Sequence, residues 1–398
     1  MGGGGKTVLA SAVVRDTRVR KHFRAGIFWL RVGQNAKEDL HALLRGLVLE
    51  LAARDNDVPL QLESLEDVTR HLTAVVAEGP SLRLVVLDDV WEGEIVDALQ
   101  HTGLQLLVTT RDRAVVSVPG ESVEVGNMEE NEALEVLRVG CGAFRTVELP
   151  RVEALQVAAD CGKLALALDL AAPLLKGPPQ DPNSWRILHD ALAARLGTHR
   201  AMTVGAHVEA VLETSFGAMA DDPCRQERCR FLAVLAPGTL APLDMLQGLW
   251  NEAYEAARTF AKQLVDQSML QAVGDAYRVH DLVLRFLKPK LKANPSRLVV
   301  ATSRAEEYCG QLRVLHRYAE DGATAGGLYS LIALWRSVES LSEEPRVAAA
   351  YKRSLNGVTE GEPWLQASGV LELMVRRVLN VFASSELPRS IRLQRWSA

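Results

Sequence analysis

A run of four glycines, Gly2 to Gly5, leads directly into Lys6 and Thr7 at the start of the sequence. Because glycine has no Cβ, consecutive glycines let several backbone N–H groups approach one anion. The apolar residues after Thr7 predict a helix, and its N-terminus would add free N–H groups and the positive end of the helix dipole. This order is typical of a phosphate-binding loop, in which the lysine reaches the β- and γ-phosphates and the threonine hydroxyl binds Mg²⁺.

The full form of this motif, Gly-x-x-x-x-Gly-Lys-[Ser/Thr], would begin one position before Met1 and would follow a β-strand. A flexible glycine tail or a cloning scar would account for Gly2 to Gly5 alone. Lys6-Thr7 ahead of an apolar helical run favours the phosphate loop. We therefore expect a nucleotide-binding sheet whose first strand, belonging in the middle of the sheet, is missing. Either the full chain begins further upstream, or the sequence is a decayed or partial gene product.

Adjacent carboxylates, Asp88 and Asp89, follow the apolar run Leu82 to Leu87, which predicts a strand buried on both faces. Ligands of open α/β folds bind at the carboxyl ends of such strands. There Asp88 could hold Mg²⁺ directly or through water, and Asp89 could orient an attacking water. The alternative is a solvated acidic pair at a strand end, and the Lys6-Thr7 motif upstream makes this alternative the weaker one.

The apolar run Leu104 to Thr109 predicts another strand, which ends in Thr110-Arg111. A planar, permanently charged guanidinium at that edge of the sheet can sense a γ-phosphate. A surface arginine after a strand is the alternative reading of Arg111 alone. The order of the three motifs favours the sensor.

The elements that would position these residues alternate between strands and helices. A strand at 26–32 precedes leucines at helical spacing from Leu40 to Leu51, and Ser64 with Asp67 predicts the start of another helix. Continuous apolar strands that alternate with helices predict a parallel sheet covered by helices on both faces.

From Asn127 onward the spacing of apolar residues predicts helices, and around Gly274-Asp275 it predicts a small β-hairpin. Asp281 is then expected to cap a further helix. Helices followed by a hairpin are typical of a winged-helix module. We expect an α/β P-loop NTPase sheet domain at 1–125, an all-α helical domain at 126–205, a winged-helix domain at 206–292, a helical, repeat-like region at 293–383 and a loose tail at 384–398.

The composition is that of an ordinary soluble protein, with 398 residues of which 48% are hydrophobic and 24% charged. Forty-five basic and 50 acidic residues leave a net charge of −5, so charge gives no reason to expect nucleic acid as the main partner. The five cysteines lack the spacing of a zinc site and indicate reduced thiols. No apolar run is long enough to cross a bilayer. We expect a soluble cytoplasmic protein.

Five motifs follow one another in a familiar order: Met1 to Thr7, Leu84 to Trp91, Val108 to Arg111, Cys161 to Leu168 and Val279 to Asp281. In these motifs roughly residues 1 to 290 resemble the NB-ARC (AP-ATPase) family of STAND signalling NTPases, which includes the apoptotic protease-activating factor and plant disease-resistance proteins. The resemblance implies that ADP or ATP, together with Mg²⁺, is the ligand and that the nucleotide sets the conformation.

The resemblance also implies roles for individual residues. Thr7 and Asp88 would bind Mg²⁺, Asp89 would be the catalytic base and Arg111 the first sensor. The phosphates would be bound by the loop and the start of its helix (Gly2, Gly3, Gly4, Gly5, Lys6, Thr7 and Val8).

Two further positions concern the adenine and the closed state. Leu164 and Ala165 would lie near the adenine, but Ala165 replaces a proline that the family normally has there, which frees the backbone and puts the shape of the base pocket in doubt. His280 would contact the β-phosphate of bound ADP and hold the closed state.

The expected function is a signal-transduction switch that is a closed monomer with ADP and that opens and forms homo-oligomers with ATP. It would be at most a slow regulatory ATPase, acting in defence or cell-death-like signalling with unidentified effector and sensor proteins. Two alternatives stay open. One is a nucleotide-free scaffold or pseudogene fragment that binds partners through its helices. The other is a transcription regulator of the related winged-helix NTPases, against which the acidic balance and a wing without clustered Lys or Arg speak.

Overall fold

The computed structural model describes residues 3–33, 36–52, 64–78, 82–116, 120–144, 146–198 and 203–309. In the first of its regions, β1 (Ile27–Gly33), β2 (Leu84–Val90) and β3 (Gln105–Thr110) form a parallel sheet in the order β1-β2-β3. Val85 in the middle of β2 lies opposite Phe28 of β1 and Leu106 of β3. The predicted parallel sheet is therefore confirmed. Its three described strands pair directly, so the described sheet has no open place in its middle, where we expected a strand to be missing.

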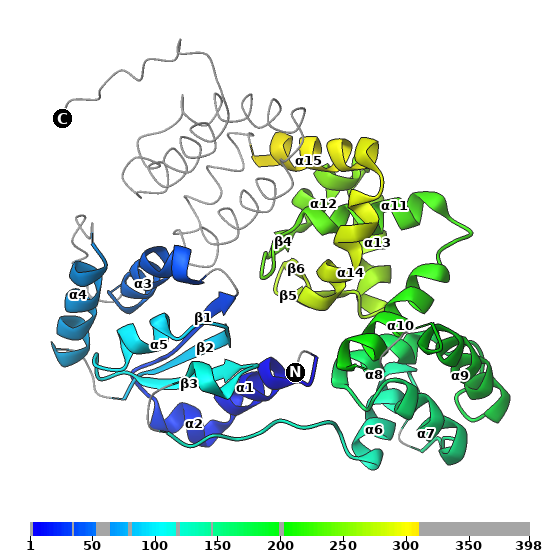
Figure 1. Cartoon of the computed structure of the whole chain (residues 1–398), viewed down its shortest axis with the longest axis horizontal. Coiled ribbons are helices and arrows are strands. Elements are labelled where there is room, and N and C mark those ends of the chain that lie inside the picture. The colour runs from blue at the N-terminus through cyan, green and yellow to red at the C-terminus, as the bar shows by residue number, and fades with distance from the viewer. Residues whose placement is uncertain are drawn as a thin grey trace, which may run out of the picture.

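Helices cover both faces of this sheet (Figure 1). On one face, α1 (Lys6–Arg15) and α2 (Thr17–His22) pack on a small cluster around Ala10, Leu84 and Val86. The other face carries α3 (Ala36–Ala52), α4 (Leu65–Glu78) and α5 (Glu94–Leu99) over a larger apolar cluster. Ser64 begins α4 as expected, since its Oγ accepts from the backbone N–H of Asp67 at 3.1 Å.

After the sheet and the short helix η1 (Arg113–Val115), an extended segment at residues 120–129 leads to a helical region (Figure 1). We call residues 130–196 the helical region. Its elements are α6 (Glu130–Gly140), α7 (Arg151–Asp160), α8 (Ala165–Ala171), η2 (Ala172–Leu174) and α9 (Pro182–Leu196).

The next segment, residues 204–292, combines helices with a small antiparallel sheet in the order β4-β6-β5, and we call it the hairpin module. Its turn is the predicted Gly274-Asp275, because β5 ends at Val273 and β6 begins at Ala276. The elements are α10 (Val204–Gly217), α11 (Pro223–Phe231), η3 (Leu232–Val234), β4 (Ala241–Pro242), α12 (Leu243–Trp250), α13 (Tyr254–Asp266), β5 (Leu270–Val273), β6 (Ala276–Val279) and α14 (Asp281–Lys292).

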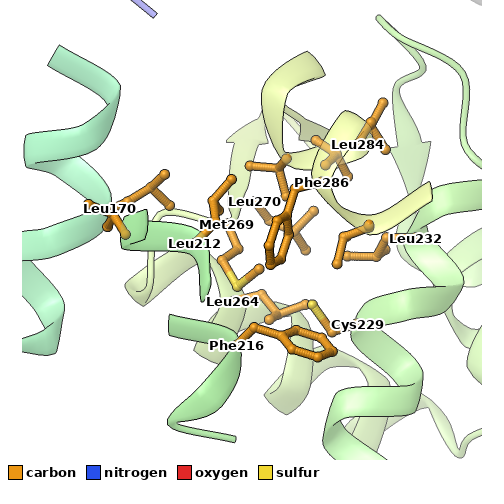
Figure 2. Close-up of a cluster of buried hydrophobic side chains, with 14 of the residues drawn as sticks. Leu170, Leu212, Phe216, Cys229, Leu232, Leu264, Met269, Leu270, Leu284 and Phe286 are labelled. Atoms are coloured by element: carbon orange, nitrogen blue, oxygen red, sulfur yellow. The ribbon is translucent and has the colours of Figure 1, made fainter. Parts of the chain in front are cut away.

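One continuous cluster of buried side chains joins the helical region to the hairpin module. Figure 2 shows part of it, where Leu170 of α8 and Leu212 of α10 lie near Met269. The rings of Phe216 and Phe286 meet edge to face, with their centroids 5.9 Å apart. These two segments therefore share a core, whereas the apolar clusters of the sheet are separate from it.

A last described helix, α15 (Pro295–Cys309), packs on the hairpin module through Leu298, Ala301 and Tyr308. The rest of the repeat-like region expected at 293–383 and the tail at 384–398 lie outside the described residues, as does Gly2. Within the described part of the chain, no helix combines the length and the apolar character that a membrane span requires.

A candidate nucleotide-binding site

The glycine loop adopts the backbone conformation that its composition allows. Gly3 has a φ of 80° and Gly5 a φ of 91°, a region that L side chains rarely adopt. Gly5 is the N-cap of α1, whose first two residues are Lys6 and Thr7. The N-terminus of α1, where the N–H groups lack partners within the helix, therefore lies at the loop, as the sequence predicted. The side chain of Val8 in the first turn is 67% exposed.

The same loop contacts two elements from distant parts of the chain. The backbone N–H of Leu166 in α8 donates to the carbonyl of Gly3 at 3.2 Å. A Cβ at Gly3 would lie 3.4 Å from Leu166 Cβ and also 3.4 Å from Cδ1 of Leu282 in α14. A Cβ at Gly5 would lie 3.7 Å from that of Ala165. The loop is thus the place where α1, α8 and α14 meet, and Figure 1 shows the beginning of the chain between them.

The residues expected near the adenine are at the start of α8. Leu164 is its N-cap, with a φ of −90° and a ψ of 129°, and is 1% exposed. Ala165 is the first helical residue. Ala165 therefore lies beside the glycine loop, and Leu164 immediately precedes it.

The predicted magnesium ligands also lie together. Thr7 Oγ1 donates to Asp88 Oδ1 at 2.8 Å, and Thr109 Oγ1 donates to the same oxygen at 2.7 Å. Asp88 is 2% exposed. A hydroxyl and a carboxylate are oxygen donors that suit Mg²⁺, which keeps several waters when few protein ligands bind it. In the part of the chain that the structure describes, no group of three or more His, Cys, Asp or Glu could hold a metal ion by itself.

Asp89, beside Asp88, faces other partners. Its φ of 58° is in the left-handed region. One carboxylate oxygen accepts from Nε of Arg111 at 3.2 Å, and the other accepts from Nε1 of Trp91 at 3.0 Å. The Arg111 guanidinium also lies 4.6 Å from the centre of the Trp91 ring, and that of Arg285 in α14 lies 5.6 Å from it. The two residues predicted to be catalytic therefore meet, but they bind each other.

His280 and Asp281 stand at the start of α14, where the expectation that Asp281 caps the helix is wrong. His280 is the N-cap, and its Nδ1 accepts from the backbone N–H of Leu282 at 3.2 Å. Asp281 is the first helical residue, and its carboxylate instead accepts from Nη2 of Arg31 in β1 at 2.8 Å. Asp281 does not cap the helix because its buried carboxylate forms an ion pair with Arg31, a cation on the neighbouring sheet. The ion pair joins the sheet directly to the hairpin module.

Several cations surround this meeting point. Burial lowers the pKa of Lys6, and the charge of Arg111 lowers it further, while Asp89 and Asp88 oppose the shift. Burial is also the main cause that lowers the pKa of His280, with Asp281 and Asp89 opposing and Arg31 and Arg111 adding to the effect. The site is therefore electrostatically suited to an anion.

Sequence reasoning missed the contacts of Arg31, Trp91 and Arg285, and it did not single out Arg278. Arg31 and Arg278 each interrupt an otherwise apolar or aromatic strand, in the runs Ile27–Gly33 and Ala276–Val279. A cation inside an otherwise apolar strand could have indicated that these arginines have a specific partner. Which acid Arg31 would pair with could not be read from the sequence, because Asp281 is 250 positions away.

Comparison with known proteins agrees with this geometry. Residues 1–143 match the family model described as the NB-ARC domain. The chain is 28% identical over 304 residues to apoptotic protease-activating factor 1 of Danio rerio, a match that covers 72% of this chain and 23% of that protein. It is 29% identical over 287 residues to a probable disease resistance protein of Arabidopsis thaliana, covering 69% of this chain and 32% of that protein. The chain is also 29% identical over 345 residues to the regulatory protein AfsR of Streptomyces griseus, a match that covers 83% of this chain and 32% of that protein.

Among solved structures, a STAND protein with a tetratricopeptide repeat sensor from Pyrococcus horikoshii matches with a TM-score of 0.47 and 14% identity, over 96% of this chain and 60% of that one. The chain spans between about a quarter and a third of the length of these curated relatives.

A helix-covered parallel sheet with a glycine loop at the start of a helix defines a P-loop-like α/β nucleotide-binding protein. Residues 1–143 match the NB-ARC domain, and the chain is similar to apoptotic protease-activating factor 1 and to plant disease resistance proteins. NB-ARC domains are nucleotide-binding signalling domains, and they bind ADP or ATP.

Proposed function

We propose that this chain is a signalling switch that is closed when it binds ADP and that opens and forms homo-oligomers when it binds ATP. The observation that carries the proposal is the contact of one glycine loop with both α8 and α14. A ligand bound at that loop would lie where the sheet, the helical region and the hairpin module meet. Its chemical state could therefore determine whether the three stay together.

The residue roles follow from the positions described above. Lys6 would bind the phosphates together with the backbone N–H groups of the glycine loop and of Val8. Thr7 and Asp88 would hold Mg²⁺, which would neutralise phosphate charge when bound. His280 would donate from a ring nitrogen to the β-phosphate, while its Nδ1 accepts from Leu282. Leu164 and Ala165 would lie against the adenine.

The pairing of Asp89 with Arg111 supports a slow, regulatory turnover. In this arrangement both oxygens of the Asp89 carboxylate already accept hydrogen bonds. A carboxylate engaged in this way has fewer acceptor sites left for a water, and an arginine paired with it is drawn away from a γ-phosphate. Hydrolysis by Asp89 and Arg111 would require this pair to separate, which ties the chemistry to opening of the molecule.

The domain organisation that we propose has a P-loop domain at 1–125, a helical domain at 126–205 and a winged-helix domain at 206–292. The helices and the small β4-β6-β5 sheet of the hairpin module support the last assignment. We place the protein in the cytoplasm, in signalling related to defence or cell death, because relatives carry the names disease resistance protein and apoptotic protease-activating factor.

Calorimetric titration with ADP in the presence of Mg²⁺ tests the proposal. We expect the wild type to bind, and Lys6→Ala to lose about 2–3 kcal/mol of binding free energy, because a charge-assisted contact with phosphate is removed. Lys21→Ala is the matched control, since Lys21 is an exposed lysine on α2 outside the site. Absence of binding by the wild type would favour the nucleotide-free scaffold. Equal affinities of Lys6→Ala and Lys21→Ala would reject the phosphate loop.

A further inference from the structure

Arg278 is a cation at the site for which the switch described above gives no role. It lies in β6, the middle strand of the small sheet, two positions before His280. Its side chain is partly buried, and its Nε is buried with no hydrogen-bond partner in the described part of the chain. Burial lowers the pKa of Arg278, the nearby charge of Arg31 lowers it further, and Asp88 and Asp281 only oppose this shift.

The acids nearby are already engaged by other groups. Asp281 pairs with Arg31 at 2.8 Å, and Asp89 pairs with Arg111 at 3.2 Å. Asp88 accepts from the hydroxyls of Thr7 and Thr109. A partly buried guanidinium with an unbonded donor and no carboxylate of its own is unfavourable unless an anion accompanies it.

Arg31 is the other strand cation near this interface, and the hairpin module holds its side chain in place. A Cβ at Gly238 would lie 2.9 Å from Cδ of Arg31, so the backbone there packs closely against this side chain. Gly238 has a φ of 85°, which favours glycine at that position. Arg31 is thus held by two parts of the module, the backbone at Gly238 and the carboxylate of Asp281. Among the described residues, no carboxylate forms an ion pair with Arg278, whose Nε stays without a hydrogen-bond partner.

The position of Asp88 indicates where that counter-charge would be. Asp88 lies opposite Arg31 in the register of β1 and β2, and Arg31 pairs with Asp281, three positions after Arg278. Asp88 also accepts from Thr7, the residue after Lys6. An anion bound at the glycine loop would therefore lie near Lys6 from the sheet side and Arg278 from the hairpin module.

We propose that Arg278 is a phosphate-binding residue that the hairpin module contributes to the nucleotide site, opposite Lys6. This inference rests on the proposed nucleotide switch and deepens it. The module would bind the β-phosphate of ADP through Arg278 as well as through His280. Release of ADP would then leave the module with an uncompensated cation at its interface with the sheet, which favours separation.

The test compares Arg278→Met, Arg278→Lys and the control Arg258→Met, whose arginine is 64% exposed on α13. Thermal unfolding of each protein is measured alone, with ADP and Mg²⁺, and with adenosine, and the affinities are measured by calorimetry. We expect the ADP affinity of Arg278→Met to fall about tenfold or more, as for loss of a charged hydrogen bond, while adenosine affinity is unchanged. Without ligand, Arg278→Met should unfold at the same temperature as the wild type or higher, because a buried charge has been removed. Arg278→Lys should keep most of the ADP affinity.

A purely structural arginine gives the opposite result, with a lower unfolding temperature for the free protein and an unchanged shift on adding ADP. That result would overturn the inference, as would equal ADP affinities for Arg278→Met and Arg258→Met. If the wild type does not bind ADP, the proposed switch fails, and inorganic pyrophosphate becomes the probe. Stabilisation of the wild type by pyrophosphate that Arg278→Met lacks would still support an anion site at Arg278, and equal responses of the two proteins would reject it.

Discussion

Neighbouring residues at this site face in different directions because of their backbone conformations. Asp88 continues β2 and accepts from Thr7 and Thr109, whereas Asp89 has a positive φ and turns toward Arg111 and Trp91. Two adjacent carboxylates thus have separate partners, one suited to a metal and the other engaged by a guanidinium. The same division occurs at the start of α14, where His280 caps the helix and Asp281 forms an ion pair.

His280 makes the stability of this arrangement depend on pH. Its pKa is lowered in the folded protein, and its Nδ1 must be unprotonated to accept from Leu282. A histidine whose pKa is lower in the folded than in the unfolded protein stabilises the fold at pH values above its unfolded pKa of about 6.5. This stabilisation is lost as the pH falls below that value, because the unfolded chain binds the proton first. The free energy of unfolding should therefore fall on acidification, with His280 adding a slope of up to about 1.4 kcal/mol per pH unit.

The control for this pH effect is His280→Asn, whose side-chain oxygen can still accept from the helix N-terminus but does not titrate in this range. Denaturant unfolding between about pH 5 and 8 should give a shallower dependence for the variant than for the wild type. The four charged groups around His280, namely Asp281, Asp89, Arg31 and Arg111, are kept in both proteins. Identical slopes would show that His280 is not the titrating group.

The parallel sheet explains which parts of the site could be predicted from the sequence. Parallel strands end at one edge, so the chain order Lys6, Asp88 and Arg111 was enough to predict that these residues meet. The pairing of Arg31 with Asp281 could not be predicted, because it depends on how the hairpin module packs against the sheet. The side chain that caps α14 also depended on local geometry, since histidine and aspartate can each accept from a helix N-terminus.

At the scale of elements, the first residues of α8 form the side of the site that lies next to the glycine loop. Its long apolar run, Leu164 to Leu170, was recognisable as a helix in the sequence, and five of its seven residues are buried. Short or weakly periodic elements such as α2 and α5 were not predicted, since six residues give too little of a helical period to stand out. The α/β order was predictable because β2 is apolar on both faces.

The start of α8 should accept the proline that Ala165 replaces. Ala165 is the first helical residue, where proline is favoured and where the backbone N–H has no partner within the helix. The ψ of 129° at Leu164 is the conformation that a following proline requires. Ala165→Pro should therefore stabilise the protein by about 0.4–1 kcal/mol, mainly by restricting the unfolded chain.

Ala171→Pro is the contrasting variant for the same helix. Ala171 is the last residue of α8, beyond the first turn, so proline there removes a helical N–H donor and should destabilise by about 3 kcal/mol or more. Thermal unfolding of both variants distinguishes the two positions. A loss of stability in Ala165→Pro similar to that in Ala171→Pro would mean that the start of α8 does not lie where we describe it.

At the scale of the whole molecule, the two interfaces of the hairpin module differ in kind. Toward the helical region it shares one continuous apolar core. Toward the sheet its described contacts include an ion pair between Arg31 and Asp281 and the stacking of Arg285 on Trp91, while the apolar clusters remain separate. Polar interfaces of this kind open more readily than apolar cores. The helical region and the module are therefore expected to move together relative to the sheet when the nucleotide changes.

A bound nucleotide would strengthen this polar interface, because the glycine loop contacts α8 and α14. Contacts that exist only in the closed arrangement stabilise that arrangement selectively. A loss of about 1.4 kcal/mol from the closed state shifts the ratio of closed to open molecules tenfold. One contact between His280 and a phosphate is large enough to set the state of such a switch.

The most direct test of this account is the rate at which a fluorescent ADP analogue dissociates from the wild type and from His280→Ala, measured by stopped flow with excess unlabelled ADP. Light scattering of both proteins with ATP reports their oligomeric state in parallel. We predict dissociation about tenfold faster for His280→Ala and a larger oligomeric fraction, because the phosphate contact from α14 is lost. Equal dissociation rates, with both proteins monomeric in ATP, would contradict a closed state held through His280.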